Sequence, residues 1–418
     1  MFRRASKQFL FITSLAVLIS ASILVFAGSA RAQQTGGDLT GGAGIFRPKN
    51  PEAKRSTNPT KPVARPNRPT KPSPNSNPAE VEEKFEDALA AGNDARDGRK
   101  FAVAEESYRA ALRLKPRDAR AHYGLGNIFT DQQRWDEAEQ SYRKAVEMAP
   151  SSAEAMVALS FVLVQPRTGG RNAKSFADAE LFARRATQLQ PTNAVAFDRL
   201  GVAMMARGMF NQDTEAAFRR AVELDPAFVV AQVHLAGVLR RMNRRDEAEP
   251  LYRAAIAQAK DAPTLVLIAD SMQSEQRWND SEPVLRRALE MDARNPSALF
   301  LLGRLLAVNK NYAEAETVLK TAVEVNPKSF PARNLLGRSY LGLERYDDAF
   351  NAYERAVEFA SDADKKQLAG AFGFGGVGDG YVKAGRSSDA VRAYQRALQL
   401  DPTNLELQSK LAAARAKS

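Results

Sequence analysis

A pair of small residues, seven positions apart, recurs nine times between residues 104 and 397 of this 418-residue chain. Two helices can approach closely only where their facing side chains are small, so each pair predicts a helix–helix contact. The pairs are Ala104/Ala111, Ala138/Ala145, Ala179/Ala186, Thr214/Ala221, Ala248/Ala255, Ser281/Ala288, Ala315/Ala322, Ala349/Ala356 and Ala390/Ala397. Successive pairs lie 33 to 35 residues apart, except for two intervals of 41 residues. A fixed internal period of this kind predicts one all-α array instead of several globular domains.

The whole pattern is clearest in the stretch Ala119–Pro150, which contains both helices of one repeat. Its characteristic residues are Leu125, Gly126, Phe129, Ala138, Tyr142, Ala145 and Pro150. At these spacings the chain resembles the tetratricopeptide repeat family, whose unit is a helix-turn-helix of about 34 residues. The resemblance implies a right-handed α-solenoid of about nine repeats, closed by a C-terminal capping helix and preceded by a disordered linker.

Two repeats are seven residues longer than the others. The first insertion is assigned to Pro166–Asn172, a loop between the two helices of the third repeat, because it contains proline and paired glycines. The second falls near Asp362–Gly370, where it lengthens either a helix or the preceding turn. Gly373, Gly375 and Gly378 then follow with G-x-G-x-x-G spacing. Because a helical repeat precedes them in place of a strand, we assign them to packing and not to phosphate binding.

Residues 1–32 have the pattern of a signal peptide for the general secretory route. Basic residues open the chain, the mostly apolar run 9–27 follows, and Ala30 and Ala32 predict cleavage after Ala32. The alternative is an uncleaved anchor, in which residues 9–27 span the inner membrane. Either interpretation places the repeats in the periplasm or outside the cell.

Residues 33–79 predict a linker that begins with glycines and becomes rich in proline, lysine and arginine. Apolar residues are too few for a core, so we expect an extended, partly polyproline spacer. Its basic residues leave two alternatives: contact with anionic envelope polymer or lipid headgroups, or a solubilising arm without a ligand. Helices are expected from near Glu80, so the array covers residues 80–402 and the capping helix residues 403–418.

The positive charge of the chain is concentrated at its N-terminal end. The net charge is +11, of which residues 1–79 carry +10, since they hold 12 Lys or Arg and 2 Asp or Glu. The remaining +1 gives the repeats no electrostatic reason to bind nucleic acid. The chain has no cysteine, and its two histidines, His122 and His234, lie more than three repeats apart. The sequence therefore predicts no catalytic, metal or cofactor site.

The family resemblance implies that the first helix of each repeat lines a concave groove that holds a peptide or a partner helix. Carried over position by position, the lining is Asn93, Arg120, Tyr123, Asn127, Phe161, Asp198, Arg199, Arg240, Arg241, Phe300, Arg304, Asn334 and Arg338. Arg304 and Arg338 lie one period apart, and together with Asn334 they predict a site for an acidic segment or a C-terminal carboxylate. The alternative is that these arginines are solvated and only keep the groove soluble.

The sequence as a whole predicts an exported, non-enzymatic adaptor that binds a protein or peptide partner in cell-envelope assembly or secretion. The first alternative is a structural scaffold of the envelope that associates with copies of itself. The recognition arm of an enzyme is the third hypothesis, and no catalytic arrangement supports it.

Overall fold

The computed structural model describes residues 48–53, 77–165 and 173–418. Throughout these ranges the regular secondary structure is helical. The described chain divides into an N-terminal unit that ends at Ser271 and a C-terminal unit that begins at Met272, and each is described by itself. The predicted signal peptide, the anchor alternative at 9–27 and the loop Pro166–Asn172 lie outside the described residues. In the described ranges, no helix combines the length and the apolar character that crossing a bilayer requires.

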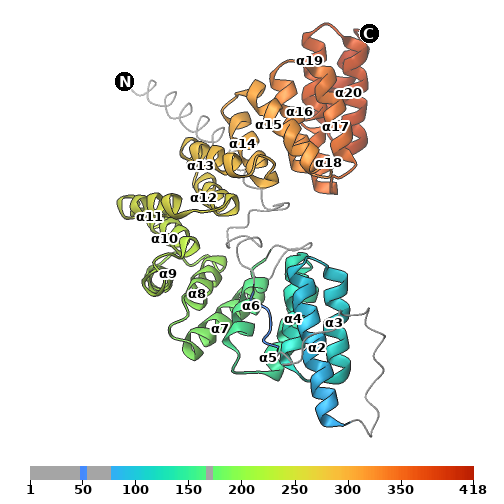
Figure 1. Ribbon diagram of the computed structural model, residues 1–418. Helices are drawn as coiled ribbons and strands as arrows, with labels where there is room; N and C mark the ends of the chain where they lie inside the picture. Colours follow the sequence, from blue (N-terminus) through green and yellow to red (C-terminus); the bar gives the residue numbers. More distant parts are fainter. Residues whose placement is uncertain (1–47, 54–76, 166–172) are drawn as a thin grey trace, which may run out of the picture. The chain divides into compact units, whose positions relative to one another are not determined.

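The helices of the N-terminal unit form consecutive pairs, one pair for each predicted repeat (Figure 1). Their bounds are α2 Pro78–Asp97, α3 Phe101–Leu114, α4 Ala119–Asp131, α5 Trp135–Met148, α6 Ala153–Leu163, α7 Ala173–Leu189, α8 Ala194–Ala206, α9 Gln212–Leu224, α10 Val229–Arg241 and α11 Arg245–Gln258, followed by α12 Ala262–Ser274, within which the boundary falls. From α2 to α11 each helix contacts the next, and first helices of neighbouring repeats also touch, as α2 does α4 and α6 does α8. This is the contact pattern of an α-solenoid.

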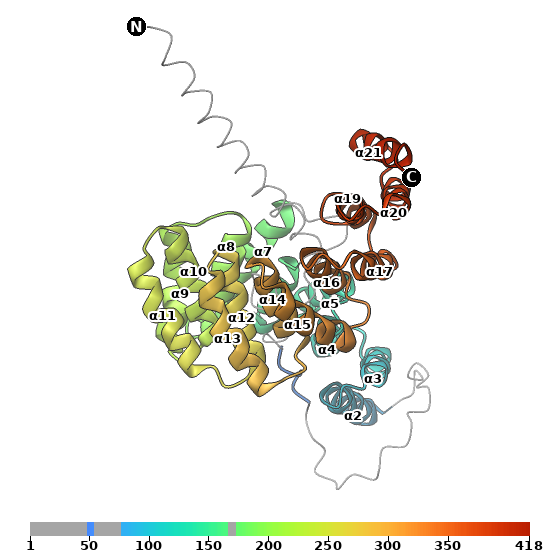
Figure 2. The same ribbon diagram turned by 90° about the horizontal axis from the view of Figure 1, so that it is seen from above.

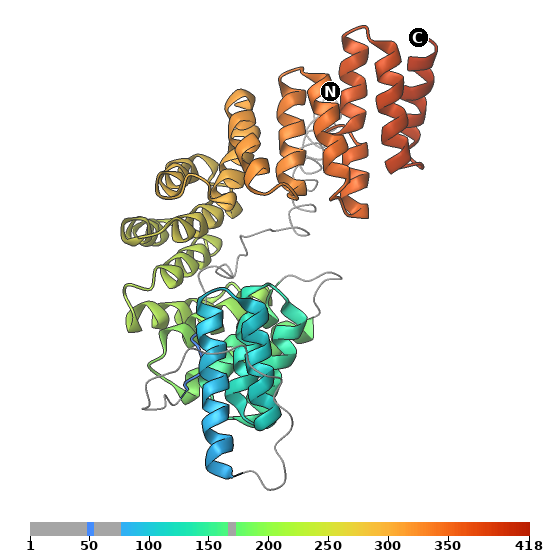
Figure 3. The ribbon, with the colours of Figure 1, turned by 45° about the vertical axis from the view of Figure 1, so that its right-hand side comes forward.

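The C-terminal unit continues the same pairing, and its later helices stand side by side in Figure 3. Its helices are α13 Trp278–Met291, α14 Pro296–Val308, α15 Tyr312–Val325, α16 Phe330–Gly342, α17 Tyr346–Val357, α18 Asp362–Ala369, α19 Phe374–Lys383, α20 Ser387–Leu400 and α21 Leu405–Arg415. The predicted α-solenoid class, with a last helix that packs on α20, is confirmed. Figure 2 shows α21 beside α20 from above.

The small-residue pairs lie where the sequence predicts them, at the helix–helix contacts. All eighteen residues of the nine pairs are buried, and none is more than 2% exposed. In several repeats a large side chain of the second helix, most often tyrosine, fills the space that a glycine of the first helix leaves open. A Cβ added at Gly126 would lie 2.5 Å from ring carbons of Tyr142, so only glycine fits there. The residues of the repeat motif are therefore those that pack between the paired helices.

The turn between paired helices has the same backbone conformation in most repeats. Its central residue adopts a positive φ between 55° and 79° at Arg99, Gln133, Gly208, Asn243, Gln276, Lys310, Glu344 and Gly385. Asparagine and serine side chains then cap several first helices; Ser152 Oγ, for example, accepts from the Ala155 N–H at the start of α6. Left-handed turns and N-caps thus fix where one helix ends and the next begins.

The second insertion forms a separate helix, α18, which neither lengthens a helix nor extends a turn as expected. A tight turn at Gly370–Gly373 separates it from α19. A Cβ at Gly373 would lie 2.0 Å from the Leu368 carbonyl oxygen, and one at Gly378 would lie 2.5 Å from the Tyr394 ring. These glycines admit close contacts with the protein's own main chain and with a repeat tyrosine.

Candidate functional site

Six residues of the predicted linker, 48–53, lie along the first helices of the N-terminal unit. This segment is far from those helices in sequence but contacts α2 and α4, and it appears as a short blue coil in Figure 1. Pro48 and Pro51 are buried, whereas Lys49 and Glu52 are exposed. The protein's own chain therefore occupies part of the groove that the family resemblance assigns to a ligand. We name residues 48–53 the arm segment.

Three side chains of the first helices donate hydrogen bonds to main-chain carbonyls of the arm segment. Asn93 Nδ2 donates to the Pro51 oxygen and Asn127 Nδ2 to the Lys49 oxygen, both at 2.8 Å. Arg96 Nη1 donates to the Pro48 oxygen at 2.7 Å. Every residue type has such a carbonyl, so these contacts recognise an extended main chain independently of its side chains.

Tyrosines of the second helices orient the two asparagine amides. Tyr108 Oη donates to Asn93 Oδ1 at 2.7 Å, and Tyr142 Oη donates to Asn127 Oδ1 at 2.9 Å. Each amide oxygen thereby accepts a hydrogen bond from a tyrosine, and the NH₂ group of the same amide faces the arm segment. Burial raises the pKa of Tyr142 well above its ordinary value of 10.0, so the hydroxyl keeps its proton. Two successive repeats thus present the same preorganised donor.

Arg96 is the largest buried cation of this site and was missed by the sequence analysis. Its side chain is 1% exposed, and it donates from Nε to Asp131 Oδ2 at 2.7 Å and from Nη2 to Asp131 Oδ1 at 3.1 Å. This two-point pair with a residue of α4 fixes the guanidinium plane and leaves Nη1 directed at the arm segment. The sequence gives little indication of this ion pair, because Arg96 and Asp131 lie 35 residues apart.

The side chain of Asn50 is recognised as well as the main chain around it. Its Oδ1 accepts from Arg96 Nη1 at 2.9 Å, and its Nδ2 donates to Asp97 Oδ2 at 2.9 Å. Arg120, a predicted groove residue, donates from Nη1 to the Glu52 oxygen at 3.0 Å. Arg120 is also paired with Glu86 and Asp118, which hold it in place.

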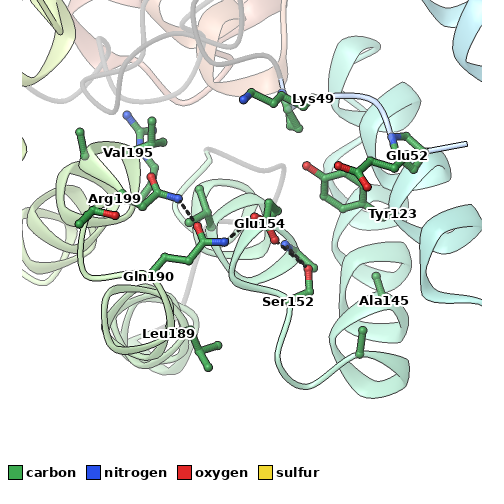
Figure 4. Close-up of a pocket in the computed structure, with 18 of the residues that line it drawn as sticks. Lys49, Glu52, Tyr123, Ala145, Ser152, Glu154, Leu189, Gln190, Val195 and Arg199 are labelled. Atoms are coloured by element: carbon green, nitrogen blue, oxygen red, sulfur yellow. Dashed lines mark hydrogen bonds between the residues drawn. The ribbon is translucent and has the colours of Figure 1, made fainter. Parts of the chain in front are cut away.

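Beside the arm segment lies a cavity of about 1350 Å³ within the N-terminal unit (Figure 4). Tyr123 and Arg199, two predicted groove residues, line it from α4 and α8. Three of its lining residues form a hydrogen-bonded chain: Gln190 Nε2 donates to Glu154 Oε1 at 2.6 Å, and Asn193 Nδ2 donates to Gln190 Oε1 at 2.7 Å. The cavity leaves room for a ligand longer than the arm segment.

Arg199 belongs to a buried cluster that ties α8 to α10. Its guanidinium pairs with Asp198, whose Oδ1 lies 2.7 Å from His234 Nδ1, and it stacks over the Phe161 ring at 5.5 Å. Burial would raise the pKa of Asp198, but the charge of Arg199 and the contact with His234 hold it below its ordinary value. Arg240, also predicted, pairs with Glu249 at 3.2 Å. The contacts of Arg199, Asp198 and His234 indicate a structural cluster beside the cavity.

The C-terminal unit places the predicted arginines against aromatic rings. Arg304 donates to Gln273 Oε1 at 2.7 and 3.0 Å and lies over the Trp278 ring. Arg338 lies over the ring of Phe372, which is 57% exposed. Asn334 is buried, and its Oδ1 accepts no hydrogen bond in the described part of the chain. The carboxylate site expected at these residues stays a prediction.

Comparison with known proteins gives several matches along the repeats. Models described as "Tetratricopeptide repeat" match residues 89–153, 233–266 and 329–403, and one described as "Anaphase-promoting complex, cyclosome, subunit 3" matches residues 274–356. No curated protein matches the chain.

Solved structures are similar at low sequence identity. Yeast Tom70 is 16% identical over 98% of this chain and 78% of that chain, with a TM-score of 0.54. MamA is 22% identical over 42% of this chain and 92% of its own, with a TM-score of 0.36. TTC0263 of Thermus thermophilus is 22% identical over 45% of this chain and 99% of its own, with a TM-score of 0.39. The likeness to Tom70 supports the α-solenoid fold.

Proposed function

We propose that this chain, which is built of tetratricopeptide repeats, is a non-enzymatic adaptor that binds an extended protein segment along the first helices of its N-terminal repeats. One observation carries the proposal: Asn93, Asn127 and Arg96 hold three main-chain carbonyls of an extended segment. The half-buried Asn93 amide, the buried Asn127 amide and the buried Arg96 guanidinium have donors directed into the groove, and buried donors need acceptors. A partner's main chain supplies acceptors at the same spacing as the arm segment does.

The adaptor hypothesis is tested with a variant whose groove holds the arm segment less tightly. The substitutions Pro48→Gly, Asn50→Ala and Pro51→Gly remove the side chains that seat the arm segment, and we name this triple substitution the open variant. We expect the open variant to bind a subset of an array of extended, proline-containing peptides, with binding that is saturable by the free peptide. If no peptide of the array binds, while circular dichroism shows an intact helical fold, the proposed function is wrong.

We further propose that the protein is exported and acts in the periplasm or outside the cell, with a partner in envelope assembly or secretion. Residues 1–32 support export, and residues 9–27 support an inner-membrane anchor as the alternative. Expressed in a bacterium with a general secretory system, the mature protein is expected to begin at Gln33. Intact-mass measurement checks this: a mass that includes residues 1–32 in a membrane fraction would favour the anchor, and the same mass in the cytosol would contradict export.

A further inference from the structure

The arm segment differs from the rest of its region in one sequence property. The stretch 48–78 contains several prolines three positions apart, as in Pro48/Pro51, Pro59/Pro62 and Pro66/Pro69. Only Pro48–Pro51 has the order Pro-x-Asn-Pro, since the residues before the other second prolines are lysine and arginine. This proline pair lies within the described residues, where it contacts α2 and α4. The groove therefore contacts a Pro-x-Asn-Pro order that occurs once in residues 33–79.

Each part of the Pro-x-Asn-Pro order meets a matching surface. Both prolines are buried, while the intervening Lys49 is exposed, so the second position is free to vary. The Asn50 amide is bonded at both ends, by Arg96 to its oxygen and by Asp97 to its nitrogen. A residue without an amide would leave the buried Arg96 with one acceptor fewer. Proline adds an extended backbone that loses little conformational freedom on binding.

The site ends where the repeat sequence changes. Asn93 and Asn127 occupy the same position of the first and second repeats, and the residue at that position in the third repeat is Phe161. Asn93 bonds to the main-chain oxygen of Pro51 and Asn127 to that of Lys49, so the two amides hold the main chain on either side of Asn50. Two asparagines and the Arg96–Asp131 pair between them thus define a site for about four residues. The cavity of about 1350 Å³ adjoins this site, and residues 48–52 line it together with Tyr123.

We infer that the groove is a receptor for Pro-x-Asn-Pro segments and that residues Pro48–Pro51 are a built-in ligand, which a partner carrying the same order must displace. The inference rests on the proposed function and adds the ligand's chemistry and its regulation. A ligand tethered to its own site has an effective concentration in the millimolar range. Only a partner that also reaches the adjoining cavity, or is present at high local concentration, gains access to the groove.

The test measures binding of a fluorescein-labelled, capped peptide with the sequence of residues 46–55 by anisotropy, to the full chain and to the open variant. We expect affinity for the open variant to be at least tenfold higher than for the unmodified chain. A peptide with alanine in place of asparagine at the Asn50 position is expected to bind the open variant at least tenfold more weakly. The matched control is Pro59→Gly with Pro62→Gly, another proline pair of the predicted linker, which should behave as the unmodified chain does.

Three results would overturn the inference. Equal affinity of the peptide for the full chain and the open variant would show that the arm segment does not compete with the peptide for the groove. Equal binding of the asparagine and alanine peptides would remove the Pro-x-Asn-Pro preference while leaving peptide binding, and therefore the proposed function, intact. A dimer that grows with concentration in light scattering, and is lost in the open variant, would assign the arm segment to the groove of a second copy.

Discussion

Ala145→Trp is expected to lower the free energy of unfolding by about 3 kcal/mol, because an indole must enter the helix contact that the Ala145 methyl group now makes. Ala145 is 1% exposed on α5, which packs against both α4 and α6. For an array of about 340 residues, the corresponding fall in melting temperature is about 4 °C. Thermal unfolding followed by circular dichroism measures it.

The matched control for this prediction is Lys144→Trp, which places the same side chain at the neighbouring, exposed position of α5. Its melting temperature should stay within about 2 °C of the parent's, since surface substitutions change stability little. Equal melting temperatures for Ala145→Trp and Lys144→Trp would contradict the helix contact on which the repeat assignment depends.

Asn93→Ala combined with Asn127→Ala is expected to weaken peptide binding to the open variant on the order of 30- to 150-fold. Each substitution removes one hydrogen bond to a main-chain carbonyl, at about 1 to 1.5 kcal/mol per bond. Isothermal titration with the peptide of residues 46–55 measures the effect. The loss should be similar for peptides of different side chains, because the two amides contact only the main chain.

The control is Asn351→Ala, the same substitution at an exposed position of α17. It should leave both the affinity and the melting temperature unchanged. A double asparagine variant that stays helical and binds the peptide as tightly as the open variant does would show that the carbonyl contacts contribute nothing to affinity.

The sequence predicts the fold well because its signal is steric. Small residues such as Ala138 and Ala145 recur wherever two helices must approach, and this periodicity is visible without any structure. The extra helix α18 was not predicted as a separate element, since its eight residues are too few to show a period and the glycines after it obscure where the chain turns.

The candidate site was predicted in part. Asn93 and Asn127 follow from their position in the repeat, but the arm segment does not, because the groove contacts its carbonyls, which are common to every residue type. Arg96 carries a charge that usually marks an exposed surface, and its burial depends on Asp131 in the next repeat. Such a pair becomes visible only when the fold brings the two helices together.

The side-chain amide resonances of Asn93 and Asn127 report most directly on the central claim that these residues bind an extended main chain. In a ¹⁵N-labelled open variant titrated with the peptide of residues 46–55, we expect both pairs of amide signals to shift together and saturate at one equivalent, while those of Asn351 stay in place. Saturable binding of the peptide without any shift of the Asn93 and Asn127 signals would contradict the account.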